Sequence, residues 1–279
     1  MTTPDLVALY VPGDRPALFD KALAGPADVV ILDLEDAVPA AGKDTARAAV
    51  AAWLASLAVA DRARISVRVN GGSSADLAVL SGLPGLHSVR VPKVESPADV
   101  ERVVAAPVHA LLESAAGIEA AFAIARAPQV AALALGEADL RSDLGVTSDE
   151  GLVWARSRVV VAARAAGLPA PMMSAWTDLA DAEGLVASCR AGRAMGFLGR
   201  TAVHPKQVEP ILTGFAPSPE EVAAAQALLD SLAAAGAGGR AVAVTASGRM
   251  VDPAMIRGAE RTLAVHNLIT RRLSGSRAS

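Results

Sequence analysis

Hydrophobic residues along the chain form short apolar runs, separated by longer segments in which apolar positions recur at helical spacing. The runs predict eight strands, at Leu6–Val11, Val29–Leu34, Ile65–Val69, Val89–Val91, Val108–Leu112, Val130–Leu135, Ala170–Ser174 and Arg200–Val203. The intervening segments predict helices at Ala17–Ala24, Lys43–Leu57, Asp76–Leu80, Gly117–Arg126, Leu152–Ala166 and Ala180–Met195, with others starting at Pro97 and in HPKQVEPIL (204–212). Eight strand–helix units in this length favour an α/β fold of the (β/α)8 TIM-barrel type. An open dinucleotide-binding sheet is disfavoured because no G-x-G-x-x-G follows any strand.

The pattern changes after Phe215, where Pro217 and Pro219 open a helix that extends to about Ala235. A Gly-rich link then precedes a hairpin pattern at Ala241–Thr245 and Arg249–Val251. A last helix is expected from Pro253 to about Leu273. We therefore expect a barrel domain over residues 1–215, which would hold the chemistry, and a C-terminal helix–hairpin–helix appendage over residues 216–279.

Composition excludes several classes of function. Aromatic residues make up only 3% of the chain and its net charge is −3, so a nucleic-acid partner is not expected. No apolar run is long enough to span a bilayer, and the first residues lack the pattern of a signal peptide. The single cysteine, Cys189, excludes an internal disulfide and fits a reducing compartment. Together these features predict a soluble cytoplasmic protein.

Carboxylates follow two neighbouring strands of the predicted barrel. Glu113 closes the run Val108–Leu112, and Glu137 and Asp139 come after Val130–Leu135. Acids presented together by neighbouring strands suit Mg²⁺, which takes few protein ligands and leaves positions for substrate oxygens. The alternative is that each acid caps the helix that follows it. Their occurrence on two successive strands favours the metal site.

Polar residues also alternate with apolar ones along the second and third strands. This alternation places Asp33 and Glu35 on one face of their strand, and Arg68 faces the same way on the next. Buried carboxylates require cations or hydrogen-bond donors. Arg68 is therefore either an ion-pair partner of Asp33 and Glu35 or a clamp for an anionic substrate, and the spacing leaves both open. Lys93 adds a cation at the same rim, or is simply solvated.

Eight short motifs occur in an order that resembles a known family. They are YVPGDRP (10–16), VILDLEDAV (30–38), VRVN (67–70), VPKVES (91–96), LLESAAG (111–117), LGEADLRSDLG (135–145), AVHPKQV (202–208) and SGRMVD (247–252). The chain thereby resembles the citrate lyase β-chain-like enzymes of the HpcH/HpaI aldolase superfamily, which include malyl-CoA and citramalyl-CoA lyases. The resemblance implies a TIM barrel, usually trimeric, that uses Mg²⁺ to make or break a carbon–carbon bond beside a thioester.

The resemblance also implies roles for individual residues. Glu113 and Asp139 match the metal ligands, and Glu113 is also expected beside the substrate. Arg68 matches the arginine that contacts the thioester and keto-acid oxygens. Glu35 matches an acid that orders metal-bound water, which makes it a further candidate for catalysis.

The resemblance also covers the loop that would bind CoA and an acid near the C-terminus. Pro12, Gly13 and Arg15 of the PGDRP loop, with Lys21, match residues that meet the nucleotide part of CoA. For Arg15 and Lys21 the alternative is ordinary solvated charge. Asp252 matches an acid that, in longer lyases, reaches the site of a neighbouring subunit; its alternative is a cap on the last helix.

We therefore expect a Mg²⁺-dependent lyase that cleaves a malyl-CoA- or citramalyl-CoA-type thioester into acetyl-CoA and a 2-keto acid, or forms it by condensation. Its partners would be the CoA thioester, the small keto acid and further copies of the chain, in a homotrimer or a dimer of trimers. Within the family, the alternative is a citryl-carrier lyase β chain of a citrate lyase complex. Outside that chemistry, the alternative is a catalytically silent barrel that binds CoA esters.

Overall fold

The structure is a computed structural model of the whole chain, and it describes residues 4–237 and 251–275. The chain divides into two compact units, Met1–Gly214 and Phe215–Ser279, which are described separately below.

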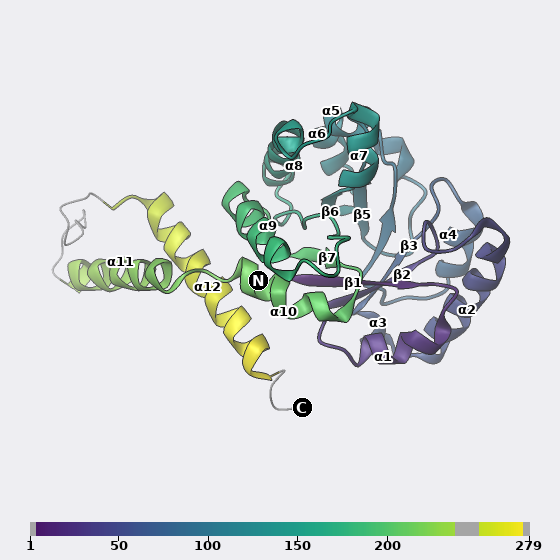
Figure 1. Cartoon of the computed structure of the whole chain (residues 1–279), viewed down its shortest axis with the longest axis horizontal. Coiled ribbons are helices and arrows are strands. Elements are labelled where there is room, and N and C mark those ends of the chain that lie inside the picture. The colour runs from purple at the N-terminus through teal and green to yellow at the C-terminus, as the bar shows by residue number, and fades with distance from the viewer. Residues whose placement is uncertain (1–3, 238–250, 276–279) are drawn as a thin grey trace. The chain divides into compact units, whose positions relative to one another are not determined.

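The first unit is built around one curled sheet of seven parallel strands (Figure 1). The strands are β1 (Val7–Pro12), β2 (Val29–Asp33), β3 (Ile65–Arg68), β4 (Ser88–Val91), β5 (Val108–Leu112), β6 (Val130–Leu135) and β7 (Arg200–Ala202). They pair in the order β6-β5-β4-β3-β2-β1-β7. Every residue of β2 is buried, as expected for a parallel strand covered on both faces.

The strand predicted at Ala170–Ser174 is not formed. This segment makes only two isolated parallel bridges, from Met172 to Ala134 in β6 and from Met173 to Arg200 in β7. Pro171 has no N–H group to donate to a ladder, and prolines are rare inside parallel sheets, which explains why the pairing stays so short. The two bridges still connect the edge strands β6 and β7, so the curled sheet is TIM-barrel-like.

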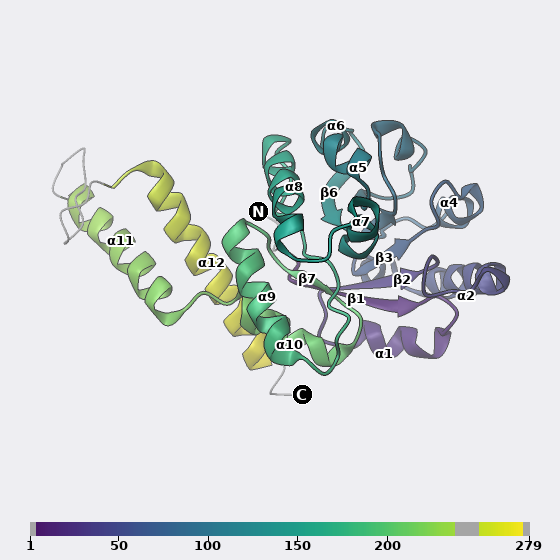
Figure 2. The ribbon, with the colours of Figure 1, turned by 45° about the horizontal axis from the view of Figure 1, so that its top comes forward.

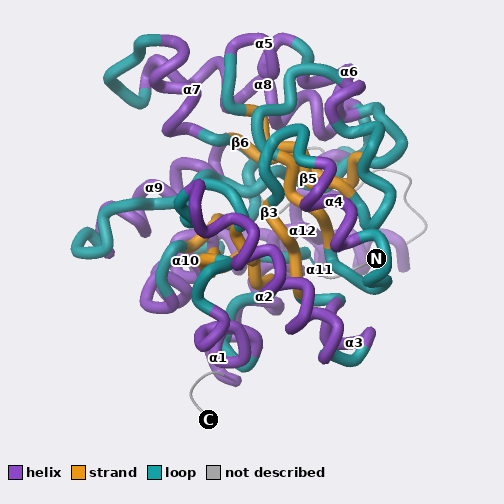
Figure 3. The backbone as a smooth tube through the Cα atoms, turned by 90° about the vertical axis from the view of Figure 1, so that its right-hand side faces the viewer, coloured by secondary structure: helices purple, strands orange, loops and turns teal. Residues whose placement is uncertain are grey.

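Helices lie around the outside of the curled sheet (Figures 2 and 3). They are α1 (Phe19–Leu23), α2 (Lys43–Ser56), α3 (Val59–Arg62), α4 (Ser74–Leu80), α5 (Ala115–Glu119), α6 (Ala121–Ala125), α7 (Glu137–Leu144), α8 (Val153–Ala165), α9 (Ala182–Met195) and α10 (Val208–Phe215). The predicted helix Gly117–Arg126 is divided into α5 and α6 at Ala120, and Pro97 begins a short 3-10 turn rather than an α-helix. Gly167 follows α8 with a positive φ of 78°, the left-handed conformation that ends helices.

The second unit contains α11 (Pro219–Ala237) and α12 (Pro253–Gly275), which pack against each other. The predicted strands Ala241–Thr245 and Arg249–Val251 lie outside the described residues, apart from Val251. No helix in the described part of the chain is long and apolar enough to cross a membrane.

Candidate functional site

A pocket of about 420 Å³ opens at the carboxyl ends of the strands in the first unit. Parallel strands of a curled sheet end at one rim, which is where TIM-barrel sites form. Its lining includes six residues from the motifs that stand at or just beyond the ends of strands, and also Tyr10, Arg90 and Thr201 from the interior. The six are Pro12, Asp33, Asp36, Arg68, Glu113 and Asp139.

Arg68, at the end of β3, is fixed by carboxylates from the end of β2. Its Nε donates to Asp33 Oδ1 at 2.7 Å and its Nη2 to Asp33 Oδ2 at 2.6 Å, a two-pronged ion pair. Nη1 lies 3.1 Å from Asp36 Oδ2 and 2.8 Å from Glu35 Oε2. Burial lowers the pKa of Arg68, but its bonds to Asp33 outweigh this and raise it. The ion pair, one of the two roles left open by the spacing, is therefore present.

Glu35 follows β2 and lies almost fully buried between two cations. Arg68 Nη1 approaches Oε2 as an ion pair rather than as an aligned hydrogen bond, and Lys93 Nζ lies 3.8 Å from Oε1. Burial raises the pKa of Glu35 to about 7, against the opposing charge of Arg68. Lys93 has a φ of 54°, a conformation that non-glycine residues rarely adopt and that occurs often at functional sites.

Glu113 extends from the end of β5 into the pocket with only 5% of its surface exposed. Its Oε2 is buried and has no hydrogen-bond partner among the described residues. Burial, followed by the negative charges of Glu35 and Asp139, raises the pKa of Glu113 to about 8. The charges of Arg68 and Lys93 oppose this only in part, and no ion pair to Glu113 forms among the described residues. A divalent metal would supply a cation there, so the residues present fit a metal ion.

The backbone opposite Glu113 leaves no room for a side chain. A Cβ added at Gly136 would lie 2.4 Å from Glu113 Cγ and 2.7 Å from its Oε1. Gly136 therefore allows the carboxylate to lie directly against the end of β6. Gly136 could not be singled out from the sequence, because the need for glycine arises from a contact between two strands.

The two acids that follow β6 have different environments. Glu137 forms a two-pronged pair with Arg156 of α8, at 2.9 and 2.7 Å. Asp139, in the first turn of α7, is exposed and lines the pocket, and its charge acts on Glu113. Within residues 4–237 and 251–275, no group of three or more His, Cys, Asp or Glu side chains is arranged to hold a metal. Further ligands of an ion at Glu113 and Asp139 would therefore come from water or substrate.

Arg90 also lines the pocket, although it was not predicted from the sequence as a site residue. Its Nη1 donates to the hydroxyls of Tyr10 and Thr201, both at 3.3 Å, and the Tyr10 ring lies between Arg68 and Arg90 with guanidinium-to-centroid distances of 4.8 and 5.7 Å. The sequence pattern could have predicted its position, because Ser88 and Arg90 alternate with valines, much as Ser66 and Arg68 alternate with apolar residues on the preceding strand.

The PGDRP loop begins at the rim. Pro12 lines the pocket, and the Gly13 amide donates to Asp33 O at 2.8 Å. A Cβ at Gly13 would lie 2.7 Å from that oxygen, so the close approach requires glycine. Arg15 and Lys21 are exposed outside the pocket, and neither forms an ion pair within the described segments. Both roles considered for Arg15 and Lys21, contact with CoA and ordinary solvated charge, therefore remain open.

Asp252 belongs to the second unit and is exposed at the start of α12. Its Oδ1 accepts a hydrogen bond from the Met255 amide at 2.8 Å, which is the capping interaction considered as its alternative role. A cap of this kind leaves the second carboxylate oxygen available for other contacts.

Comparison with known proteins agrees with this geometry. An L-malyl-CoA/beta-methylmalyl-CoA lyase of Cereibacter sphaeroides is 34% identical, covering 92% of this chain and 93% of the lyase. A (3S)-malyl-CoA thioesterase of the same species is 35% identical, covering 92% of each protein. The crystal structure of CitE from Mycobacterium tuberculosis in complex with magnesium, acetoacetate and coenzyme A superposes with a TM-score of 0.79 at 34% identity. That match covers 94% of this chain and 98% of CitE.

The family model for HpcH/HpaI aldolase/citrate lyase matches residues 6–205, which include β1 to β7 and all the pocket residues named above. The chain is therefore a carbon–carbon lyase that belongs to the HpcH/HpaI aldolase/citrate lyase family.

Proposed function

We propose that the protein is a Mg²⁺-dependent lyase that cleaves a malyl-CoA- or citramalyl-CoA-type thioester into acetyl-CoA and a 2-keto acid. The observation that carries this proposal is the buried carboxylate of Glu113, whose Oε2 has no hydrogen-bond partner in the described part of the chain and which lies in one pocket with Asp139 and Arg68. The names of the relatives support the substrate class, and the complex of CitE with magnesium supports the metal.

Glu113 and Asp139 are the proposed metal ligands. They leave most of an octahedral Mg²⁺ shell to water and substrate oxygens. When bound there, Mg²⁺ would polarise the carbonyl of the keto acid. Glu35, held beside Arg68 and Lys93, would orient water at the same end of the pocket.

Arg68 would stabilise the negative charge that develops on the thioester oxygen as the carbon–carbon bond breaks. Asp33 binds one edge of the guanidinium through two hydrogen bonds, so the group is already oriented before substrate enters and needs no reorganisation. Its Nη1 faces the carboxylates of Glu35 and Asp36, and an anionic substrate would compete with them for this donor.

The remaining roles concern CoA and proton transfer. Pro12 and Gly13 would contact the CoA chain at the rim, with Arg15 and Lys21 meeting its phosphates. In cleavage, the substrate hydroxyl loses a proton, the bond between the α and β carbons breaks, and the enolate carbon of acetyl-CoA gains a proton. Asp252 of a neighbouring subunit would donate the proton to that carbon, in a homotrimer with shared sites.

The test is turnover of a panel of CoA thioesters, including malyl-CoA and citramalyl-CoA, with and without a chelator. We expect formation of acetyl-CoA and keto acid that stops in excess EDTA and resumes with Mg²⁺. Glu113→Gln and Asp139→Asn should both lose at least about 100-fold in kcat. Unchanged turnover in either variant, or in EDTA, would exclude the proposed metal site.

A second candidate is hydrolysis of the thioester, which the relative named a malyl-CoA thioesterase supports. The products separate the two reactions, because hydrolysis releases free CoA and malate whereas cleavage gives acetyl-CoA and glyoxylate from malyl-CoA. Thiol detection of free CoA alongside detection of the keto acid distinguishes them in one assay.

A further inference from the structure

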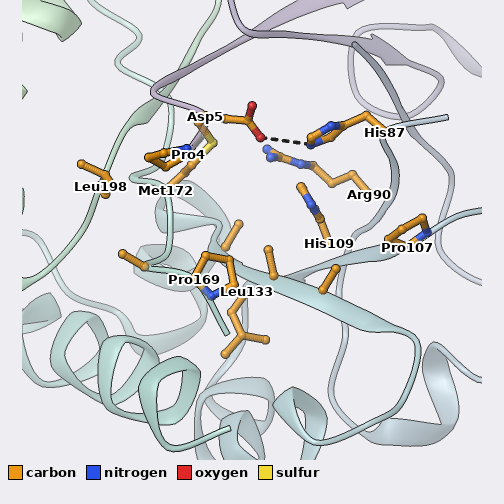
Figure 4. Close-up of a pocket in the computed structure, with 14 residues that line it drawn as sticks. Pro4, Asp5, His87, Arg90, Pro107, His109, Leu133, Pro169, Met172 and Leu198 are labelled. Carbon is orange, nitrogen blue, oxygen red and sulfur yellow. Dashed lines mark ion pairs between the residues drawn. The ribbon is translucent and has the colours of Figure 1, made fainter. Parts of the chain in front are cut away.

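A second pocket, of about 380 Å³, lies at the opposite, amino-terminal end of the curled sheet (Figure 4). It is lined by residues that precede or begin strands, such as Asp5 before β1 and Pro107 before β5. Only Arg90 and Ala134 line both this pocket and the catalytic one. Apart from Asp5, His87, Arg90 and His109, every lining residue is alanine, proline, leucine or methionine.

Arg90 provides a buried cation without a counter-charge. It is only 2% exposed, its Nε has no hydrogen-bond partner, and Nη1 makes two long bonds to hydroxyls. No carboxylate in the described part of the chain lies within ion-pair distance of it. Arg68, by contrast, is paired with three carboxylates. A buried charge is costly unless it is paired, so this site favours an incoming anion.

The two histidines lie on the same side of the pocket as Arg90. His87 Nε2 is 3.1 Å from Asp5 Oδ2, and the ring of His109 packs edge-on against His87 with centroids 5.4 Å apart. Figure 4 shows Asp5, His87, Arg90 and His109 gathered together, with Leu133 and Pro169 across the pocket. The one carboxylate on the wall thus pairs with His87, and Arg90 and His109 stay available.

We propose that this pocket binds a small organic monocarboxylate with a short apolar chain. The planar guanidinium of Arg90 presents donors in the geometry that matches a carboxylate, and the His109 ring can add a further hydrogen bond. The apolar chain would contact the alanine, leucine and proline side chains, as in ligand pockets where a few polar groups fix orientation. The apolar lining favours such a ligand over inorganic phosphate or sulfate.

Histidine NMR offers a direct test, because the chain has only four histidines and two of them line the pocket. Acetate, butyrate and hexanoate are titrated into the full-length protein while the imidazole ¹H–¹⁵N signals are followed. We expect saturable shifts of His87 and His109, with His204 and His266 unchanged, and affinity that rises about fourfold per added methylene. Butanol, butylamine and sulfate should bind at least about tenfold more weakly than butyrate, since each lacks the charge or the chain.

Two variants assign the binding to this pocket. Ala132→Leu fills the amino-terminal pocket only, and Ala175→Leu is the matched change in the catalytic pocket only. The first should abolish the shifts and the second should leave them intact. Arg90→Met, which keeps the length of the side chain, should weaken butyrate binding at least about tenfold by calorimetry. Circular dichroism checks that each variant is folded.

Three results would overturn the proposal. The histidine signals could stay unchanged up to saturating hexanoate. Binding could survive Ala132→Leu but vanish with Ala175→Leu, which would place the carboxylate in the catalytic pocket. Lastly, folded Arg90→Met could bind butyrate as tightly as the natural sequence.

Discussion

At the scale of single residues, the position of Glu113 depends on a neighbour without a side chain. A Cβ at residue 136 would lie 2.4 Å from Glu113 Cγ, far inside van der Waals contact. We expect Gly136→Ala to push the carboxylate away from Asp139 and to raise the Kd for Mg²⁺ at least about tenfold, with a similar or larger loss of kcat. Isothermal titration calorimetry and steady-state kinetics measure the two effects.

Gly82→Ala is the matched control, because nothing lies within 4 Å of a Cβ at that position and its φ is not positive. This variant should bind Mg²⁺ and turn over like the natural sequence. If Gly136→Ala did the same, the close approach to Glu113 would not matter for the metal.

The pKa of Glu113 gives a second prediction. Burial raises it from 4.5 to about 8, so between these pH values the folded, metal-free protein holds a proton that the unfolded chain releases. The free energy of unfolding without metal should therefore fall as pH rises from about 4.5 to 8. Urea unfolding in EDTA at pH 5.5 and 8.5 should show this loss, and Glu113→Gln should reduce the difference between the two values.

Magnesium should reverse this loss, because the ion binds the deprotonated carboxylate and favours proton release. Between about pH 6 and 8 its affinity should rise up to about tenfold per pH unit. A Kd that does not change with pH would show that Glu113 is already ionised without metal.

Residues of the site differ in how far the sequence alone could predict them. Asp33, Glu35 and Arg68 were placed together correctly, because strand alternation and the order of parallel strands depend on local pattern. Whether Arg68 forms an ion pair could not be decided, since this depends on the side-chain rotamer, which strand alternation does not specify. Gly136 could not be identified either, because its role exists only where β5 and β6 lie side by side.

At the scale of elements, α7 carries Asp139 to the pocket and is fixed by its first residue. Glu137 pairs with Arg156 of α8 through two hydrogen bonds at 2.9 and 2.7 Å. We expect Arg156→Met to loosen the start of α7 and raise the Kd for Mg²⁺ about three- to tenfold, even though Arg156 touches no pocket residue by hydrogen bond. The cost in stability should be about 3 kcal/mol, as for a partly buried ion pair that loses one partner.

Arg158→Met is the control on the same helix, because Arg158 is half-buried and donates to the Glu119 carbonyl, with no ion pair to a carboxylate among the described residues. Equal Mg²⁺ affinity in both variants would show that the Glu137 pair does not position Asp139. Calorimetry of each variant at one pH makes the comparison.

The prediction of whole elements succeeded where hydrophobic pattern decides and failed where single residues interrupt it. Seven of the predicted strands, which form β1 to β7, and α2, α8 and α9 lie close to their expected positions. The Ala170–Ser174 strand was wrong because Pro171 prevents a regular ladder, although its apolar residues still fill the gap between β6 and β7. The Gly117–Arg126 helix divides at Ala120, and nothing in its Ala-rich pattern marks that point.

At the scale of the whole molecule, the proposed function requires Asp252 to act on a neighbouring subunit. Asp252→Asn should lose at least about 100-fold in kcat while its Kd for Mg²⁺ stays the same, because metal binding and proton transfer would use different residues. Since asparagine also caps helices, α12 should remain intact. Kinetics and calorimetry on the same preparation test both parts.

Mixing Asp252→Asn with the metal-ligand variant Asp139→Ala extends this test to the assembly. In mixed trimers, some sites would combine an intact metal pair with an intact Asp252 from the next subunit, so activity should partly return. Mixed trimers that form by native mass spectrometry but stay inactive, or an active monomer, would exclude a shared site.

The two short bridges at Met172 and Met173 also determine where the curled sheet can open. Met173 exchanges hydrogen bonds with Gly199 and Thr201, and Pro171 has no amide proton to extend this ladder. Pairs inside the sheet, such as Leu32 with Val67, belong to continuous ladders. Amide hydrogen exchange should therefore be at least about tenfold faster at Met173 and Thr201 than at Leu32, and equal rates would contradict this. The next residues along the chain, Ser174 and Ala175, line the catalytic pocket. Thermal opening of the ring would thus begin beside the site where the proposed thioester would enter and its products would leave.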